Sequence, residues 1–342
     1  MSRPTIKDVA RESGYSITTV SLVLNNKDVS IPESTRAAIW EVVRRLGYRP
    51  NQLAVGMITR KTNIVGLIIP DNSNSFFADI SKFIEIAAEK RGYNVIYGNS
   101  ANSPQKDLTY MEAFADRQVD GIIYTKSSPD SMEDDHRVLD FISNNSVPMV
   151  TIDRVLTNSE VSAVVLDQFQ GGYLAAKHLI ELGHRRIGCY TGPSNLENSQ
   201  ERLEGYRYAL AEAGIPFVKE YIFEGNFQIG PEEEAFDCLI RQNVTAVFAF
   251  NDIMALGLYR IAQKRRFEIP KDLSIIGFDD IWAGLVVQPA LTTVRQPIAQ
   301  MAECAVETLV RQINGKRPSE KKYMFEPQLV TRGSTARITT KE

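Results

Sequence analysis

Short polar segments follow several apolar runs in the larger, C-terminal part of this sequence. These segments are Asp71–Asn74, Asp153–Arg154, Asn251–Asp252 and Asp279–Asp280. Four aromatic residues lie close to the ends of these apolar runs: Phe76, Phe77, Phe227 and Trp282. Carboxylate, amide and guanidinium groups form hydrogen bonds with hydroxyl groups, and aromatic rings stack on apolar ring faces. The combination suits the binding of a polyhydroxylated ring.

Each of these positions also has a purely structural interpretation. Asn251 directly precedes a predicted helix and Asp279 follows a predicted strand, so the two are candidate helix caps or turn residues. Phe76 and Phe77 fit an ordinary core, and Asp153–Arg154 fits a surface ion pair. Taken together, four polar segments at strand ends favour a small-molecule cleft over four separate structural roles.

The polar segments meet only if the strands before them are parallel. The apolar runs predict strands at 64–70, 94–98, 121–125, 149–153, 186–190, 221–224, 246–250 and 273–278. Amphipathic patterns predict helices at 76–91, 105–118, 132–144, 167–182, 200–213, 231–242 and 253–265. Apolar strands separated by helices indicate an α/β body of two doubly wound parallel-sheet subdomains. Ligands bind outside the carboxyl ends of such strands, so we expect one cleft between the two sheets.

The first 60 residues have a different organisation. Residues 5–25 read TIKDVARESGYSITTVSLVLN, which places two short amphipathic helices around a tight turn at Ser13–Tyr15. Such a pair is a helix-turn-helix, whose second helix enters the DNA major groove. A third helix is predicted to end at Gly47, giving an all-α head. The following segment, Gln52–Thr59, is weakened as a helix by Gly56, by about 1 kcal/mol relative to Ala, and is expected to fold only against a partner.

Charge is unevenly distributed along the 342 residues. The whole chain has a net charge of −3, whereas residues 1–60 carry nine Lys or Arg and five Asp or Glu, a net charge of +4 that leaves −7 for the rest. A small basic head on an acidic body is typical of a DNA-binding head with a separate sensing body. Chance and solvated helix faces are the alternative explanation of the charge split.

Several other classes of protein are disfavoured by the sequence. The cysteines Cys189, Cys238 and Cys304 are too widely spaced for a disulfide framework or a zinc site, and the three histidines lack metal-ligand spacing. No P-loop and no G-x-S-x-G motif occurs, so we expect no catalytic residue, metal or cofactor. The sequence has no signal peptide and no membrane-spanning run, so we expect a cytoplasmic protein rather than a periplasmic-type sugar receptor.

Six motifs occur together from one end of the chain to the other. They are TIKDVARESGYSITTVSLVLN, GYRPNQLA, IIPDNSNSFF, FNDIMALG, IIGFDDI and QPALTTVRQP. Together they resemble the lactose/galactose repressor (LacI/GalR) family of bacterial transcription regulators, whose body has the fold of periplasmic sugar-binding proteins. The resemblance implies a DNA-binding domain at 1–49, a hinge at 50–61, and an effector-binding and dimerisation domain at 62–342. It also implies that strands cross between the subdomains, so that 292–317 belongs with the first.

The resemblance assigns functional residues at matching positions. For DNA binding these are Thr5, Ser16, Ile17, Thr18, Thr19, Ser21, Leu22, Asn25, Asn51, Ala54, Val55 and Met57. For effector binding they are Asn74, Phe76, Phe77, Asp153, Arg154, Gln200, Phe227, Asn251, Asp279 and Gln296.

Four positions depart from the family pattern. Gln200 stands where many sugar-responsive members have Arg, and Leu22 stands where the recognition helix often has Arg. In the hinge, which commonly reads Ala-Arg-x-Leu, Val55 replaces the Arg, so that contact is lost. Met57 replaces the leucine that wedges into the minor groove, and Met is an acceptable wedge.

The implied function is a homodimeric repressor that a sugar effector releases from a palindromic operator in double-stranded DNA. A purine-type regulator, in which the ligand strengthens DNA binding, is the alternative within the family. A stand-alone sugar-binding receptor is the alternative from another class. Asp153, Arg154 and Gln296 match ribose-type sites and favour a sugar.

Overall fold

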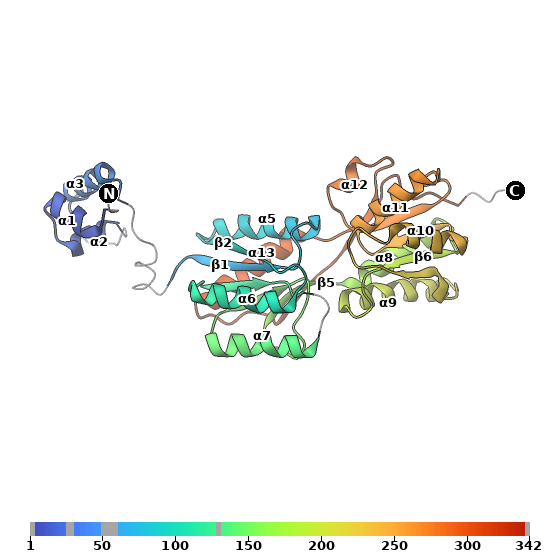
Figure 1. Cartoon of the computed structure of the whole chain (residues 1–342), viewed down its shortest axis with the longest axis horizontal. Helices are drawn as coiled ribbons and strands as arrows, with labels where there is room; N and C mark the ends of the chain where they lie inside the picture. Colours follow the sequence, from blue (N-terminus) through green and yellow to red (C-terminus); the bar gives the residue numbers. More distant parts are fainter. Residues whose placement is uncertain (1–3, 25–30, 49–60, 128–130, 339–342) are drawn as a thin grey trace. The chain divides into compact units, whose positions relative to one another are not determined.

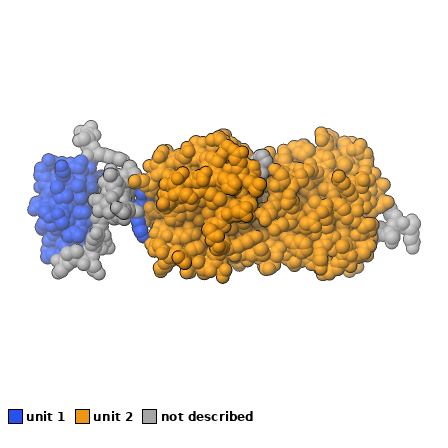
Figure 2. Space-filling model, turned by 90° about the horizontal axis from the view of Figure 1, so that it is seen from below, with its two compact units in different colours: residues 1–62 blue, residues 63–342 orange. Residues whose placement is uncertain are grey.

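The computed structural model describes residues 4–24, 31–48, 61–127 and 131–338 (Figure 1). The chain divides into two units, residues 1–62 and residues 63–342, which are coloured separately in Figure 2. The predicted hinge, 50–61, lies outside the described residues except for Lys61.

Unit 1 contains a helix-turn-helix followed by a third helix. The helices are α1 (Ile6–Ser13), α2 (Ile17–Leu24) and α3 (Glu33–Leu46). Gly14 ends α1 with a left-handed backbone, φ 73°, which glycine adopts without steric cost. The three helices enclose one apolar cluster: Val9, Ala10, Val20, Val23, Ile39, Val42 and Val43. The predicted helical head is confirmed.

Unit 2 contains two six-stranded sheets. The first has the order β11-β5-β4-β3-β1-β2, and all of its strand pairs are parallel. Its strands are β1 (Ile64–Ile69), β2 (Asn94–Asn99), β3 (Gly121–Tyr124), β4 (Met149–Ile152), β5 (Ser162–Leu166) and β11 (Lys322–Phe325).

Helices cover both faces of the first sheet (Figure 1). They are α5 (Ser75–Glu89), α6 (Pro104–Asp116), α7 (Met132–Asn145) and α13 (Ile298–Ile313). Alternate residues of β1 face different helices, since Leu67 shares a core with Ile80 of α5, whereas Ile68 packs with Met111 and Phe114 of α6. A strand that is apolar on both faces is what a doubly covered parallel sheet requires.

The second sheet has the order β12-β10-β9-β8-β6-β7, with only β12 antiparallel to its neighbour in the part of the chain that the structure describes. Its strands are β6 (Ile187–Thr191), β7 (Ile222–Glu224), β8 (Ala246–Ala249), β9 (Ser274–Asp279), β10 (Thr292–Arg295) and β12 (Gln328–Val330). Its helices are α8 (Gln168–Glu181), α9 (Glu197–Glu212), α10 (Glu232–Arg241), α11 (Asp252–Lys264) and the short α12 (Ala283–Val286), with a 3-10 turn at Lys219–Tyr221. The predicted two-subdomain α/β body is confirmed.

The prediction for 292–317 needs correction. Thr292–Arg295 is β10, which pairs with β9 in the second sheet, and only α13 packs on the first sheet. The later strand β11 returns to the first sheet, where Lys322 pairs with Ala163 of β5. The chain therefore crosses between the two subdomains in several places, and both subdomains belong to one compact unit.

Candidate functional site

Two adjoining cavities lie at the carboxyl ends of strands from both sheets of unit 2. Their volumes are about 200 Å³ and about 40 Å³, and they share five lining residues: Asn74, Phe77, Arg154, Leu196 and Phe227. Residues that follow β1 and β4 line them from the first sheet, and residues that follow β6, β7 and β8 line them from the second. This is the position at which doubly wound folds bind ligands.

Two buried carboxylates line the smaller cavity from different sheets. Asp153 follows β4 and Asp279 ends β9, and their exposed fractions are 5% and 6%. Both have positive φ, 72° and 111°, which is uncommon for residues other than glycine and is concentrated at functional sites. Nδ2 of Asn198 donates a hydrogen bond to Oδ1 of Asp153 at 3.2 Å.

The guanidinium group of Arg202 in α9 is buried beside these carboxylates. Its Nε donates to Oε1 of Gln168 at 2.7 Å, and Nη1 donates to the carbonyl oxygen of Phe250. The guanidinium carbon lies 3.6 Å from the ring centre of Phe278, a cation–π contact. A Cβ atom on Gly172 would lie 2.1 Å from the carbonyl oxygen of Arg202, so this glycine allows α8 and α9 the close approach that positions the arginine.

The buried charges alter one another's protonation. Burial raises the pKa of Asp279 to about 7, and the positive charge of Arg202 partly opposes this shift. Burial also raises the pKa of Asp153, against the opposing charges of Arg154 and Arg202. The pKa of Arg202 is lowered by burial, and the two carboxylates oppose that shift. Perturbed groups that converge on a cavity are typical of a binding or active site.

Arg154 is held from behind by a buried polar network. Its Nη1 donates to the carbonyl oxygen of Lys126 at 2.7 Å, and Nζ of Lys126 lies 2.9 Å and 3.0 Å from the two oxygens of Asp135. The guanidinium group lies 5.8 Å from the ring centre of Phe77 and 3.6 Å, measured from Nε, from Oδ2 of Asp153. Nε of Arg154 is buried without a hydrogen bond among the described residues, so it is a donor that a ligand could engage.

Aromatic rings line the cavities from both subdomains. Phe76 and Phe77 form an edge-to-face pair with ring centres 5.1 Å apart. Phe227 lines both cavities from the other subdomain and has a positive φ of 62°. Its carbonyl oxygen accepts a hydrogen bond from Nδ2 of Asn251 at 3.0 Å, and its ring lies where a Cβ atom on Gly192 would clash, at 2.1 Å.

Two of the asparagines that line the cavities, Asn74 and Asn251, are also helix caps. Oδ1 of Asn74 accepts from the backbone N–H of Phe76 at 3.0 Å, and Oδ1 of Asn251 accepts from that of Met254 at 2.9 Å. The structural interpretation of Asn251 as a helix cap is therefore correct, and both asparagines still line the smaller cavity. Capping orients the side chains at the cavity wall.

Two of the predicted residues lie away from the cavity walls. Gln296 is buried and donates from Nε2 to Oδ1 of Asp279 at 2.7 Å, so it acts on the cavity through that carboxylate. Trp282 is 64% exposed and lines neither cavity, because it begins the short exposed segment that contains α12.

The prediction for Gln200 also needs correction. Gln200 is exposed on α9, and its Nε2 donates to the carbonyl oxygen of Ser194 at 2.9 Å instead of facing the cavities. The arginine that α9 contributes to the smaller cavity is Arg202, which the sequence prediction missed together with Asn198. A signal was present, since Arg202 shares helical spacing with the buried Tyr206 and Ala209, where an unpaired charge is costly.

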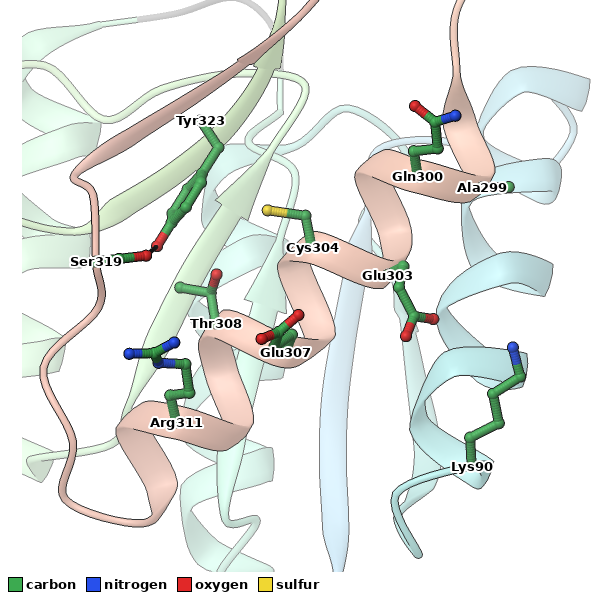
Figure 3. Close-up of a pocket in the computed structure, with 10 residues that line it drawn as sticks. All are labelled: Lys90, Ala299, Gln300, Glu303, Cys304, Glu307, Thr308, Arg311, Ser319 and Tyr323. Atoms are coloured by element: carbon green, nitrogen blue, oxygen red, sulfur yellow. Dashed lines mark hydrogen bonds between the residues drawn. The ribbon is translucent and has the colours of Figure 1, made fainter.

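A larger cavity, of about 550 Å³, lies on the surface of the first subdomain beside α13 (Figure 3). Glu303, Cys304, Glu307 and Arg311 of α13 line it, with Tyr323 of β11 opposite. All of its lining residues come from the first subdomain, and its charged groups are of both signs. An occupant there would not contact the second sheet, so we take the two cavities between the sheets as the candidate effector site.

The described DNA-binding candidates lie at the start of α1 and along α2. Thr5, Ser16, Ile17 and Thr18 are exposed, and Thr19, Ser21 and Leu22 are half-buried. Ser16 caps α2, since its Oγ accepts from the backbone N–H of Thr19 at 3.0 Å. The remaining candidates lie outside the described residues: Asn25, Asn51, Ala54, Val55 and Met57.

The described residues contain neither a metal-binding cluster nor a membrane-spanning helix. No group of three or more His, Cys, Asp or Glu side chains there is placed to hold a metal ion. No described helix is long and apolar enough to cross a bilayer.

A helix-turn-helix head joined to a body of two parallel-sheet subdomains defines the class of DNA-binding regulators with a periplasmic-binding-protein-like body. The family model for bacterial regulatory proteins of the lacI family matches residues 5–51, and that for a periplasmic binding protein-like domain matches 176–335. The chain belongs to the lacI family; it is a transcriptional regulator with a DNA-binding domain, and its relatives are regulators, not enzymes.

Three similar proteins illustrate the relationship. The HTH-type transcriptional regulator DegA of Bacillus subtilis is 37% identical over 99% of this chain and 100% of its own length. The HTH-type transcriptional repressor PurR of Aliivibrio salmonicida is 33% identical over 98% of this chain and 99% of its own. The crystal structure of a LacI family transcriptional regulator from Enterococcus faecium with bound ribose is 29% identical, with a TM-score of 0.73, over 81% of this chain and 100% of that one.

Proposed function

We propose that this protein is a homodimeric transcriptional repressor that binds a palindromic operator and is released from it by a sugar. The observation that carries the proposal is the cluster of Asp153, Arg154, Arg202 and Asp279 in a cavity between the two sheets. Three buried charged groups and the partly buried Arg154, flanked by aromatic rings, are costly in an apolar interior and are suited to a ligand rich in hydroxyls. The sugar-bound Enterococcus faecium structure supports the same ligand class.

Each group has a role in the proposed complex. The carboxylates of Asp153 and Asp279 accept hydrogen bonds from ring hydroxyls, and Arg154 donates to a ring or hydroxyl oxygen through Nε, which forms no hydrogen bond among the described residues. Phe77 and Phe227 stack on the apolar faces of the ring. A pentose fits the volumes of about 200 Å³ and about 40 Å³ with room for bridging water. Because the ligand would touch both subdomains, binding would change their spacing, which is the means of allosteric coupling.

Pairing of two copies is supported by an exposed apolar patch. Trp282, Leu285 and Val286 lie within five residues at α12, and their exposed fractions are 64%, 55% and 65%. Large apolar side chains that gather at one exposed place mark interaction sites, and two-fold dimers are the commonest assembly. Light scattering after size-exclusion chromatography tests this part, since a monomer at micromolar concentration would contradict it.

A purine-type ligand that strengthens DNA binding is the second candidate. Two phenylalanine rings, Phe77 and Phe227, line the cavities and would also suit a planar base. The two buried carboxylates favour a ligand with several hydroxyl donors over a flat base, so the sugar remains the first choice.

A thermal-shift screen tests the ligand class. Free pentoses, free hexoses, their phosphates and purine bases are added singly to the full-length protein. A ligand that binds the native state raises the melting temperature by mass action. We expect a rise with a free sugar, and its loss in Asp279→Ala. A rise with purine bases alone would overturn the sugar proposal in favour of the second candidate.

A further inference from the structure

The outward face of α2 is unusual for a helix that enters a DNA groove. It consists of Ile17, Thr18, Ser21 and Leu22, on the side opposite the buried Val20 and Val23. Ile17 is 46% exposed, although a large aliphatic side chain at that position contributes to no core. Large apolar side chains that are exposed on a surface mark a place where the protein contacts a partner, and they indicate that the contacted group is apolar.

None of the eight residues of α2, Ile17–Leu24, carries a charge or a side-chain amide. Arg and Lys read guanine, and Asn and Gln read adenine, through paired hydrogen bonds in the major groove. The described part of this helix has neither kind of side chain. The hydroxyl of Thr19 is engaged at the helix start, where its Oγ1 lies 2.8 Å from Oγ of Ser16. The outward face keeps the hydroxyls of Thr18 and Ser21, which form hydrogen bonds with either kind of base and so discriminate little.

The methyl groups of Ile17, Thr18 and Leu22 remain as the main groups of this face. In the major groove the one apolar feature that differs between base pairs is the C5-methyl group of thymine, which aliphatic side chains contact. We infer that α2 reads its half-site chiefly through thymine methyl groups against Ile17 and Leu22. The inference rests on the proposed function, since it specifies the DNA sequence that the proposed operator must contain.

The test begins with selection of binding sites by the full-length protein from a library of random-sequence duplexes. In the selected site, each thymine is then replaced singly by uracil, which removes only the methyl group. We expect the affinity to fall about fourfold for each contacted methyl, the effect of burying one such group. At the same positions cytosine should bind weakly, and 5-methylcytosine should recover part of the loss.

Variants assign the contacts to side chains. Ile17→Ala and Leu22→Ala should each remove the difference between thymine and uracil at one position per half-site and leave it at the others. Leu22→Gln is a second variant, expected to shift the preference at its position toward adenine, which a glutamine binds through two hydrogen bonds. Ser13→Ala, outside α2, is the control and should leave the discrimination unchanged. Circular dichroism melting establishes that each variant head is folded.

The outcomes separate this inference from the proposed function. A selected site in which uracil substitution has no effect at any position, or in which the effect persists in both alanine variants, overturns the methyl readout alone. Enrichment of no sequence at all overturns DNA recognition itself, and the inference falls with it.

Discussion

Nε2 of Gln296 lies 2.7 Å from Oδ1 of Asp279, and both side chains are buried, at 3% and 6% exposure. Gln296 directly follows β10, whereas Asp279 ends the neighbouring strand β9. The hydrogen bond therefore fixes the carboxylate at the cavity before any ligand arrives. No other hydrogen bond to Asp279 occurs among the described side chains, so Oδ2 is available to a ligand hydroxyl. An acceptor oriented in advance loses little entropy on binding.

The variant Asp279→Asn tests the raised pKa of this carboxylate, because that pKa determines how the free energy of unfolding depends on pH. Because burial raises its folded-state pKa from 3.8 to about 7, the folded protein holds the proton more tightly than the unfolded chain does. The free energy of unfolding should therefore fall as pH rises from about 4 to about 7 and then level off. The variant lacks this contribution. Its free energy of unfolding minus that of wild type should therefore rise between about pH 4 and about pH 7, by at most about 4 kcal/mol.

Urea denaturation of both proteins at pH 4.5, 6 and 8 provides the measurement. Other buried acids also affect the wild-type curve, since burial raises the pKa of Asp107 as well. The difference between the two proteins isolates Asp279. A difference that stays constant with pH would mean that the carboxylate has an ordinary pKa.

Arg202→Met should destabilise unit 2 by about 3 kcal/mol, because it removes the buried positive charge that stabilises the carboxylates of both Asp153 and Asp279. The buried Gln168 and Phe250 would also lose their hydrogen bonds from the guanidinium group. Adding Asp279→Asn to this variant should recover part of the loss, since it removes one uncompensated charge. Thermal melting of wild type, of each single variant and of the double variant measures this, and strict additivity of the two substitutions would argue against coupling between the residues.

Gln200→Ala should leave sugar affinity within about twofold of wild type, since an exposed side chain away from the cavities contributes little to binding. Asn198→Ala is the matched variant on the same helix, and it removes the hydrogen bond to Asp153. Isothermal titration calorimetry should show weaker binding only for Asn198→Ala. A large loss in Gln200→Ala would restore the original prediction for that residue.

Residues 63–342 alone should fold, bind the sugar and fail to bind operator. The division of the chain at Thr62 and the separate core of unit 1 are the reasons. Calorimetry and a gel-shift assay on the truncated protein are the measurements. Specific operator binding by this fragment would place DNA recognition outside the head.

Much of the fold could be predicted because the central strands are continuous apolar runs. β1, Ile64–Ile69, was predicted within one residue for this reason. The strands that escaped prediction are mostly short and lie at or near the sheet edges, such as β11 with the sequence KYMF and β12 with QLV. These two edge strands are exposed or half-buried along their length and lack a continuous apolar run, whereas β5, which also escaped prediction, is a buried strand of five residues.

The site was predicted less completely than the fold. Asp153 and Arg154 follow a strand and Asp279 ends one, so they are visible as polar breaks in the sequence. Arg202, in contrast, lies within a helix among ordinary surface charges. Only the packing of α9 against α8 shows which of its polar residues face inward. Trp282 illustrates the reverse error, because proximity in sequence to Asp279 does not bring it to the cavity.

The central claim is that occupancy of the cavity between the two sheets controls DNA binding by the head. The most direct measurement is fluorescence anisotropy of a labelled operator duplex, obtained by selection, titrated with the sugar found in the thermal-shift screen. Wild type should release the DNA, and Asp279→Ala should bind the same DNA with equal affinity yet release it only at about tenfold or more higher sugar concentration, because a charge-assisted hydrogen bond is lost. Release of both proteins at the same sugar concentration would contradict the account.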